Sequence, residues 1–245
     1  MIRPFFTFYG GKWRAVPKYP SPQYPTIVEP FAGSAGYAVR YADRQVILCD
    51  TDPKITRVWS YLIHVSPEEL LNLPDLPDHV HVDTLPVCQE AKWLIGYWLN
   101  KGSAQPRNFP SAWMRSRVRP GSYWGERVRK VLAAQVPLIR HWKVYECSYE
   151  QCPYEGPATW FLDPPYQHAG KHYQHGSKFI DYEGLGQWAR ARQGQVIVCE
   201  NEGATWLPFE PLGATKATPG RFREGYSKEV IATWLNSKCG SWSGD

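Results

Sequence analysis

The sequence of 245 residues predicts an α/β fold organised around a doubly wound sheet. The prediction rests on three short apolar runs with the length and the β-branched or aromatic content of buried strands, at 26–28, 46–49 and 160–162. Each run is followed closely by an acidic residue or a glycine-rich turn. Open α/β sheets bind ligands at the carboxyl ends of their strands. We therefore expect these polar residues to lie together at one edge of the sheet.

A glycine-rich turn, Gly33-Ser34-Ala35-Gly36, follows the first run, and we expect a helix to begin near Tyr37. Strand, glycine turn and helix in this order form the nucleotide-binding start of a doubly wound sheet. The spacing Gly-x-x-Gly differs from the dinucleotide motif Gly-x-Gly-x-x-Gly, so it favours a smaller adenosine-containing ligand. A purely structural tight turn is the alternative.

The second run ends in an acidic residue, Asp50. A carboxylate at the end of this strand is positioned to bind both hydroxyls of a ribose. Asp52 competes for that role, and either residue also suits the cap of a helix that begins near Pro53. We favour Asp50 as the ribose ligand.

The third run stops at Asp163-Pro164-Pro165-Tyr166, because two prolines cannot continue a strand ladder. A carboxylate and a freed proline carbonyl can each accept a hydrogen bond from one exocyclic amino group, while the tyrosine ring stacks on the heterocycle. Two acceptors aimed at one NH2 raise the electron density on nitrogen and favour its attack on a methyl group. The alternative is an Asx-Pro turn in which Tyr166 is ordinary packing.

The other elements are expected in alternation along the chain. Helices are predicted at 53–65, from Ser66 onward, at 89–100, at 126–142 and at 181–192, and further strands at 143–147, 195–199 and 228–235. The proline-rich segments 16–26 and 74–86 are expected to be connections. The helix at 126–142 is clearly amphipathic, so its basic residues are expected to form a solvated face.

Residues 101–125 interleave basic and aromatic side chains without periodicity. Such a pattern favours a surface that contacts phosphates and bases, although an ordinary solvated loop is the alternative. Further basic residues stand in the polar segment 167–180 and in an expected hairpin tip at 219–225. The candidate nucleic-acid contacts are Arg107, Trp113, Arg115, Arg117, Arg119, Tyr123, Lys171, Arg221 and Arg223.

Composition allows a polyanionic partner but does not establish one. The net charge of +5 and the pI near 8.8 are mildly basic, and the chain has 12 Trp and 15 Tyr. Its six cysteines form no CxxC pair, so we expect reduced thiols and no metal site. The chain shows no signal sequence and no apolar run long enough to span a bilayer, which predicts a soluble intracellular protein without a membrane partner.

Four elements occur in a recognisable order: Phe6 to Lys12, Glu29 to Gly36, Cys49 to Asp52, and Asp163 to Tyr166. With these elements the chain resembles the DNA adenine-N6 methyltransferases of the Dam type, in which the glycine motif precedes the recognition region and Asp-Pro-Pro-Tyr follows it. The segment 227–231 is also similar to the last strand of that family. The likeness covers both ends of the chain and leaves the middle, about 53–140, unmatched.

The resemblance implies the S-adenosylmethionine-dependent methyltransferase fold, a Rossmann-like sheet that is mostly parallel with one antiparallel strand. It further implies a catalytic domain formed by residues 1–55 and 141–245. Residues 56–140 would be a small, mainly helical insertion that recognises the target. An enzyme of this family moves a methyl group from S-adenosylmethionine to N6 of an adenine that is flipped out of duplex DNA.

The resemblance also assigns roles to residues. Asp163, Pro164, Pro165 and Tyr166 would hold the target base. The cofactor would contact Tyr9, Gly10, Gly11, Lys12, Glu29, Pro30, Phe31, Gly33, Ser34, Gly36, Asp50, Ser148, Tyr149 and Asp163. Ser148 departs from the family pattern, because many relatives place an Asp there to bind the adenine ring of the cofactor.

The expected partner is double-stranded DNA, and the expected state is a monomer or weak dimer without metal in the bacterial cytoplasm, encoded by the cell, a virus or a mobile element. The role would be restriction-modification or the masking of sites. Two other functions remain open: an enzyme that methylates a base amino group in RNA, and a DNA-binding protein that has lost catalysis. The target sequence is left open by the unmatched middle region.

Overall fold

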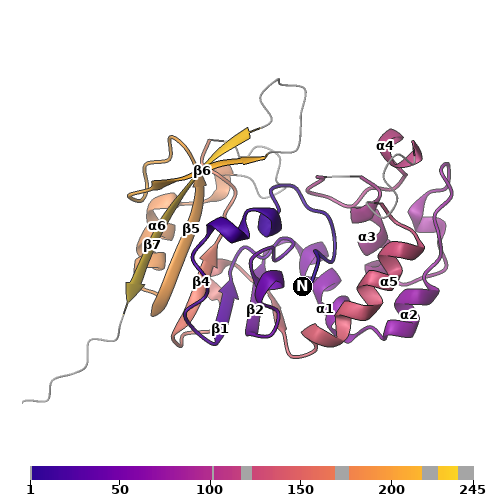
Figure 1. Ribbon diagram of the computed structural model, residues 1–245, viewed down its shortest axis with the longest axis horizontal. Helices are drawn as coiled ribbons and strands as arrows, with labels where there is room; N and C mark the ends of the chain where they lie inside the picture. Colours follow the sequence, from indigo (N-terminus) through magenta and orange to yellow (C-terminus); the bar gives the residue numbers. More distant parts are fainter. Residues whose placement is uncertain (1, 101, 117–122, 169–176, 217–225, 237–245) are drawn as a thin grey trace, which may run out of the picture.

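The computed structural model describes residues 2–100, 102–116, 123–168, 177–216 and 226–236. Its sheet has seven strands in the order β3-β2-β1-β4-β5-β7-β6 (Figure 1). The strands are β1 (Thr26–Glu29), β2 (Gln45–Asp50), β3 (Lys143–Glu146), β4 (Ala158–Leu162), β5 (Gly194–Asn201), β6 (Glu210–Lys216) and β7 (Tyr226–Asn236). All pairings among β1 to β5 are parallel, whereas β7 pairs antiparallel with both β5 and β6. The predicted fold class is confirmed.

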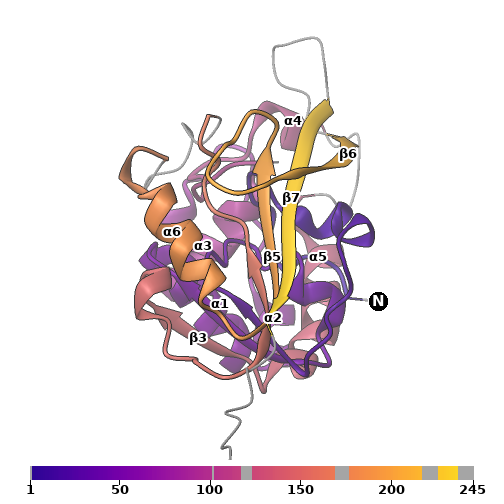
Figure 2. The same ribbon diagram turned by 90° about the vertical axis from the view of Figure 1, so that its left-hand side faces the viewer.

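The helices fall into two groups. Five lie together on one side of the molecule, and α6 lies beside β5 and β7 on the other (Figures 1 and 2). The α-helices are α1 (Pro53–His64), α2 (Pro67–Asn72), α3 (Gln89–Trp98), α4 (Ala112–Arg115), α5 (Glu126–Gln135) and α6 (Tyr182–Arg190). Short 3-10 helices are η1 (Lys12–Arg14), η2 (Val16–Lys18), η3 (Ala38–Tyr41), η4 (Val82–Thr84), η5 (Val136–Ile139), η6 (Tyr149–Gln151) and η8 (Ser177–Phe179).

Alternate residues of the strands face two separate hydrophobic cores. In β1, Ile27 belongs to the core shared with helices α1, α3 and α5, whereas Val28 belongs to the core shared with α6. On the α6 side, Leu185 and Ala189 are fully buried against the sheet. Side chains alternate between the faces of a strand, so a sheet covered on both faces needs apolar residues at nearly every position.

Strand β4 positions the residues that were expected to carry chemistry. All five of its residues are buried, and it lies between β1 and β5 near the middle of the sheet. Asp163 follows immediately, so the Asp-Pro-Pro-Tyr segment leaves the sheet at the centre of its carboxyl edge. This arrangement agrees with the strand that was predicted over 160–162.

The helix expected near Tyr37 is present, but it is a short 3-10 helix rather than a regular α-helix. The chain there forms the 3-10 helix η3 and β2 begins at Gln45, which leaves little length for a regular α-helix. Ala35 has a φ of 48°, and the Ala38 N–H donates a 2.6 Å hydrogen bond to Oε1 of the buried Glu29. The tight turn and this buried acceptor take the place of ordinary helical bonds.

Two further differences follow from proline. The predicted helix at 126–142 is an α-helix only to Gln135 and continues as η5, because Pro137 cannot donate to the helical ladder. Strand β6 was not predicted, and it contains Pro211 and Gly213, residue types that are uncommon inside strands. It pairs with β7 through an irregular register between these two residues, which is where an edge strand tolerates them.

The border predicted between residues 55 and 56 falls inside α1, which packs against β2 and β3. The division into a catalytic domain and a recognition insertion stays a prediction. Among the described residues, none of the helices has the length and hydropathy of a membrane span.

Candidate functional site

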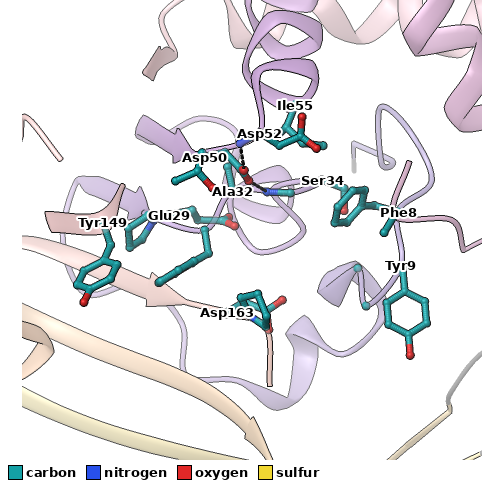
Figure 3. A pocket seen from close by; sticks show the side chains of 18 of the residues that line it. Phe8, Tyr9, Glu29, Ala32, Ser34, Asp50, Asp52, Ile55, Tyr149 and Asp163 are labelled. Atoms are coloured by element: carbon teal, nitrogen blue, oxygen red, sulfur yellow. Dashed lines mark hydrogen bonds between the residues drawn. The ribbon is translucent and has the colours of Figure 1, made fainter. Parts of the chain in front are cut away.

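A cavity of about 370 Å³ lies at the carboxyl ends of β4, β1 and β2 and against the segment that follows β3. Figure 3 shows Tyr149 and Tyr9 at opposite ends of this cavity, with Glu29, Asp50 and Asp163 between them. All residues that were predicted to bind the cofactor line it: Tyr9, Gly10, Gly11, Lys12, Glu29, Pro30, Phe31, Gly33, Ser34, Gly36, Asp50, Ser148, Tyr149 and Asp163. Segments far apart in the sequence therefore form one site.

The Asp50 carboxylate holds the glycine-rich turn against the end of β2. Its Oδ2 accepts a 2.9 Å hydrogen bond from the Gly33 N–H, and its Oδ1 accepts one from the Asp52 N–H. Gly33 has a φ of 45°, and its carbonyl accepts a 2.8 Å hydrogen bond from the Trp59 indole. These contacts fix the turn in a conformation that favours glycine.

Asp52 is the helix cap that the sequence left undecided. One of its carboxylate oxygens accepts a hydrogen bond from the Lys54 N–H at the start of α1. The other accepts a 2.8 Å bond from the Gln105 side-chain amide. Gln105 also lines the cavity but was not among the predicted residues, because nothing in the sequence links it to Asp52.

Gly36 is required by a close approach of two backbones. A Cβ atom at this position would lie 2.7 Å from the Trp13 nitrogen and 2.9 Å from the Lys12 nitrogen. The glycine-rich turn therefore packs directly on the segment that carries Gly10, Gly11 and Lys12. The two motifs form one structural unit.

A buried ion pair joins that unit to the end of β4. The Lys12 ammonium lies 2.8 Å and 2.9 Å from the two carboxylate oxygens of Asp163 and donates a 2.8 Å hydrogen bond to the Gly10 carbonyl. It also lies 4.9 Å from the centre of the Tyr166 ring. Burial raises the pKa of the Asp163 carboxyl, and the Lys12 charge opposes this shift.

The four residues predicted to hold the target base differ in their access to the cavity. Asp163 and Pro165 line it, whereas Pro164 is buried and the Tyr166 ring packs against the hydrophobic core beneath Lys12. The Tyr182 hydroxyl donates a 2.5 Å hydrogen bond to the Pro165 carbonyl. Asp163 therefore faces the cavity, whereas the Tyr166 ring lies on the far side of the Lys12–Asp163 ion pair, against the core.

Glu200 secures the chain that follows the tetrapeptide. It ends β5 as a fully buried side chain and accepts hydrogen bonds from the N–H groups of Gln167, at 2.5 Å, and Asn201, at 2.6 Å. Burial raises the pKa of its carboxyl, and the two backbone donors oppose the shift. The sequence showed an acid at the end of a strand but gave no sign of its partner at Gln167.

Glu29 is almost fully buried at the end of β1, beside Asp163 and Lys12. Burial raises the pKa of its carboxyl from the ordinary 4.5 to about 8, although the Ala38 N–H opposes the shift. At neutral pH the protonated form therefore predominates in the folded protein.

We expect the pH dependence of stability to report this protonation. Because the folded pKa of Glu29 is raised, its contribution to stability is fully present below the unfolded pKa and is lost as the pH rises through about 8. The loss, relative to Glu29→Gln, should be on the order of 4 kcal/mol. The measurement is the free energy of unfolding of both proteins in urea between pH 5 and pH 9. Parallel curves would show that Glu29 does not titrate in this window.

Six acidic side chains line the cavity, and all but the protonated Glu29 can carry negative charge at neutral pH: Glu29, Asp50, Asp52, Glu150, Asp163 and Asp181. Lys12 is the basic residue of that lining, and it is paired with Asp163. Such a lining suits a ligand that carries positive charge and polar hydrogen-bond donors, because unlike charges attract strongly in a partly buried site.

The segment that contributes most residues to this cavity matches the sequence model of a known protein family. Residues 8–82 match the family model of the D12 class N6 adenine-specific DNA methyltransferase. The match supports the adenine-N6 methyltransferase family, and it includes Lys12, the glycine-rich turn and Asp50 but ends before Asp163.

The comparisons with curated proteins and with solved structures give no further information on function. No curated protein matches the chain. One similar solved structure is a conserved hypothetical protein from Streptococcus pyogenes, with 11% sequence identity, coverage of 86% of each chain and a TM-score of 0.39.

The residues predicted to contact nucleic acid are only partly described. Arg107 is exposed beside a second, open hollow, and the exposed Arg115 donates a 2.6 Å hydrogen bond to the Pro110 carbonyl. Tyr123 packs against the core, and the backbone of Trp113 belongs to α4. The candidates Arg117, Arg119, Lys171, Arg221 and Arg223 lie outside the described residues.

Within the described residues, no group of three or more His, Cys, Asp and Glu side chains is arranged to hold a metal ion. The described cysteines are free thiols: Cys49, Cys88, Cys147, Cys152 and Cys199.

Proposed function

We propose that this protein transfers a methyl group from S-adenosylmethionine to N6 of an adenine in duplex DNA. The observation that carries the proposal is the acidic cavity that joins Asp163, at the end of β4, to the glycine-rich turn and Asp50. The match of residues 8–82 supports adenine in DNA as the methylated group.

The lining residues fit this cofactor. S-adenosylmethionine is cationic at its sulfonium and amino groups, and the acidic lining offers carboxylates to both. A volume of about 370 Å³ lies within the range of ligand pockets. Asp50 stands where a carboxylate can accept bonds from ribose hydroxyls, and the glycine-rich turn allows the backbone to approach the ligand closely. When bound, the cofactor supplies a methyl group that its sulfonium has already activated.

Asp163 would act on the target base. Its carboxylate can accept a hydrogen bond from the exocyclic N6 amino group and so direct the nitrogen lone pair towards the methyl group. The amino proton becomes acidic only after the nitrogen is alkylated, so the carboxylate need not be a strong base. Lys12 holds the carboxylate in place and stabilises its charge. The main contribution of these residues is alignment of the reacting atoms.

The base must leave the duplex to reach this cavity, because N6 of a stacked pair cannot approach Asp163. Extrusion costs a few kcal/mol of stacking and pairing, which contacts inside the protein must offset. We place duplex DNA on the side of the protein that carries Arg107 and Arg115, both of which are exposed.

The direct test is transfer of labelled methyl from S-adenosylmethionine to unmethylated duplex DNA and, in parallel, to total RNA, followed by nucleoside analysis. We expect N6-methyladenine in the DNA. Label confined to RNA would favour the alternative enzyme and overturn the substrate. Absence of label in both, with the cofactor still bound, would favour a DNA-binding protein without catalysis.

Salt dependence tests the DNA surface. Each phosphate contact contributes about 0.9 to the slope of log K against log salt concentration. We expect Arg107→Ser and Arg115→Gln together to reduce this slope by up to about 2, with little change in sequence preference. The measurement is DNA affinity at several salt concentrations, with Arg127→Ser on the solvated face of α5 as the matched control. An unchanged slope in the double variant would place the DNA on another surface.

A further inference from the structure

The order of the strands shows which end of the cavity each part of a bound cofactor would occupy. Going from Asp163 at the end of β4 to Ser148 beyond β3, the path crosses β1 and β2. Neighbouring strands lie about 4.8 Å apart, so the two positions are separated by roughly 14 Å. If the reacting methyl group lies near Asp163 and the ribose near Asp50 on β2, the heterocycle of the cofactor must lie beyond β2, beside the residues that follow β3. This inference rests on the proposed function.

That end of the cavity is aromatic. The rings of Phe31 and Tyr149 have centroids 5.6 Å apart and an interplanar angle of 30°. Tyr149 also contacts Trp188 of α6, with centroids 5.3 Å apart and nearly perpendicular rings. Figure 3 shows Tyr149 at the end of the cavity far from Tyr9. A flat heterocycle fits beside these rings.

Asp181 brings a carboxylate to the same end from a different element. It lines the cavity and is the N-cap of α6, where its Oδ1 accepts a 3.1 Å hydrogen bond from the Gly184 N–H. Among the described residues, its Oδ2 has no hydrogen-bond donor. Asp181 and Tyr149 line the same cavity, and Trp188 of the helix that Asp181 caps contacts the Tyr149 ring.

The other polar groups at this end are Ser148 and Glu150, and neither is a carboxylate held by a helix cap. The Ser148 side chain takes part in the capping box of η6 with Gln151. The Glu150 carboxylate accepts a 3.3 Å hydrogen bond from the Tyr149 hydroxyl. Asp181 is the carboxylate whose position is fixed by a helix cap while one oxygen remains available within the described part of the chain.

We propose that Asp181 accepts a hydrogen bond from the exocyclic amino group of the cofactor's adenine ring and so selects adenine over hypoxanthine in the cofactor. The cap bond through Oδ1 holds the carboxylate at the edge of the cavity, and Oδ2 is the oxygen that would accept the bond from the heterocycle. An amino group at C6 donates to this oxygen, whereas the oxo group of hypoxanthine is repelled by it. This role replaces the contact that the sequence left in doubt at Ser148.

The test is a comparison of two ligands, S-adenosylhomocysteine and its counterpart with hypoxanthine in place of adenine, by isothermal titration calorimetry. We expect wild-type protein to bind the adenine compound about 10-fold to 100-fold more tightly, as for a hydrogen bond to a charged group. In Asp181→Asn the side-chain oxygen still caps α6, and the amide NH2 replaces Oδ2. This variant should lose most of the preference or reverse it, because the NH2 group can donate to the oxo group.

One stability measurement and two control variants accompany this test. Asparagine is as good a helix cap as aspartate, so the unfolding temperature of Asp181→Asn should be close to that of wild type. Glu183→Gln removes an exposed carboxylate two residues further along the chain, in the first turn of α6, and should leave both affinities unchanged. Glu150→Gln tests the neighbouring acid of the cavity and should preserve the preference for adenine.

The outcomes separate this inference from the proposed function. Tight binding by wild type with an unchanged preference in Asp181→Asn would overturn the role of Asp181 alone. A preference lost in Glu150→Gln but kept in Asp181→Asn would assign the contact to Glu150. Absence of binding of the adenine compound to wild type would overturn the proposed function, and this inference with it.

Discussion

Substitution of Asp163 by asparagine is expected to reduce methyl transfer to DNA by about 10²–10³-fold, the loss typical of removing one group aimed at the reacting atoms. The amide keeps the shape of the carboxylate and one acceptor oxygen for Lys12, but it lacks the charge and the second acceptor oxygen. Initial rates of transfer from labelled S-adenosylmethionine, at saturating cofactor, measure the effect. DNA retention should change little, because the carboxylate lies inside the cavity rather than on the surface.

The alanine variant separates catalysis from stability. Asp163→Ala leaves the Lys12 ammonium buried without its carboxylate, which costs about 3–5 kcal/mol of folding free energy. Asp163→Asn should reduce the folding free energy by less. A similar loss of activity in both variants would therefore show that the loss comes from the reaction step and not from unfolding. Glu155→Gln, at an exposed position, is the control and should behave as wild type. Normal turnover in Asp163→Asn would remove Asp163 from the reaction.

The pH dependence of the rate should follow the same carboxylate. Burial raises the pKa of Asp163, so the ionised form is lost at a higher pH than for an exposed aspartate as the solution is acidified. The Lys12 charge opposes that shift, and activity should fall as acidification protonates Asp163, beginning at a higher pH than for an exposed aspartate.

Replacement of Gly36 by alanine should both destabilise the fold and abolish cofactor binding. The new methyl group would lie 2.7 Å from the Trp13 nitrogen and 2.9 Å from the Lys12 nitrogen, which are backbone atoms that cannot rotate away. Overpacking of this kind typically costs about 1–3 kcal/mol. Displacement of Lys12 would also disturb its pairing with Asp163. Thermal unfolding and calorimetric titration with S-adenosylhomocysteine measure the two effects.

A second glycine gives the control for this substitution. A Cβ atom at Gly125, the N-cap of α5, would meet nothing within 4 Å, so Gly125→Ala should leave cofactor affinity at the wild-type value. Wild-type affinity in Gly36→Ala would show that the backbone around Lys12 can shift without harm to the cavity.

The sequence by itself determined the parts of the fold that depend on local pattern. The buried strands at 26–28, 46–49 and 160–162 were readable because a sheet covered on both faces needs continuous apolar runs. The polar residues at the ends of these strands could be predicted for the same reason, because an apolar run ends where the strand leaves the core. Asp50, Asp163 and the glycine-rich turn therefore met at one cavity, as expected.

Only the tertiary structure decided which groups act on one another across the sheet. Three hydrogen bonds join residues 3 to 53 positions apart: the cap bond of Asp181 to Gly184, the bond of the Gln105 amide to Asp52, and the bond of Glu200 to the Gln167 N–H. The packing of Gly36 on Lys12 and the ion pair that sets Tyr166 behind Lys12 also depend on the order of the strands. Periodicity reports which face of an element is buried, but it contains no information on which neighbour that face will meet.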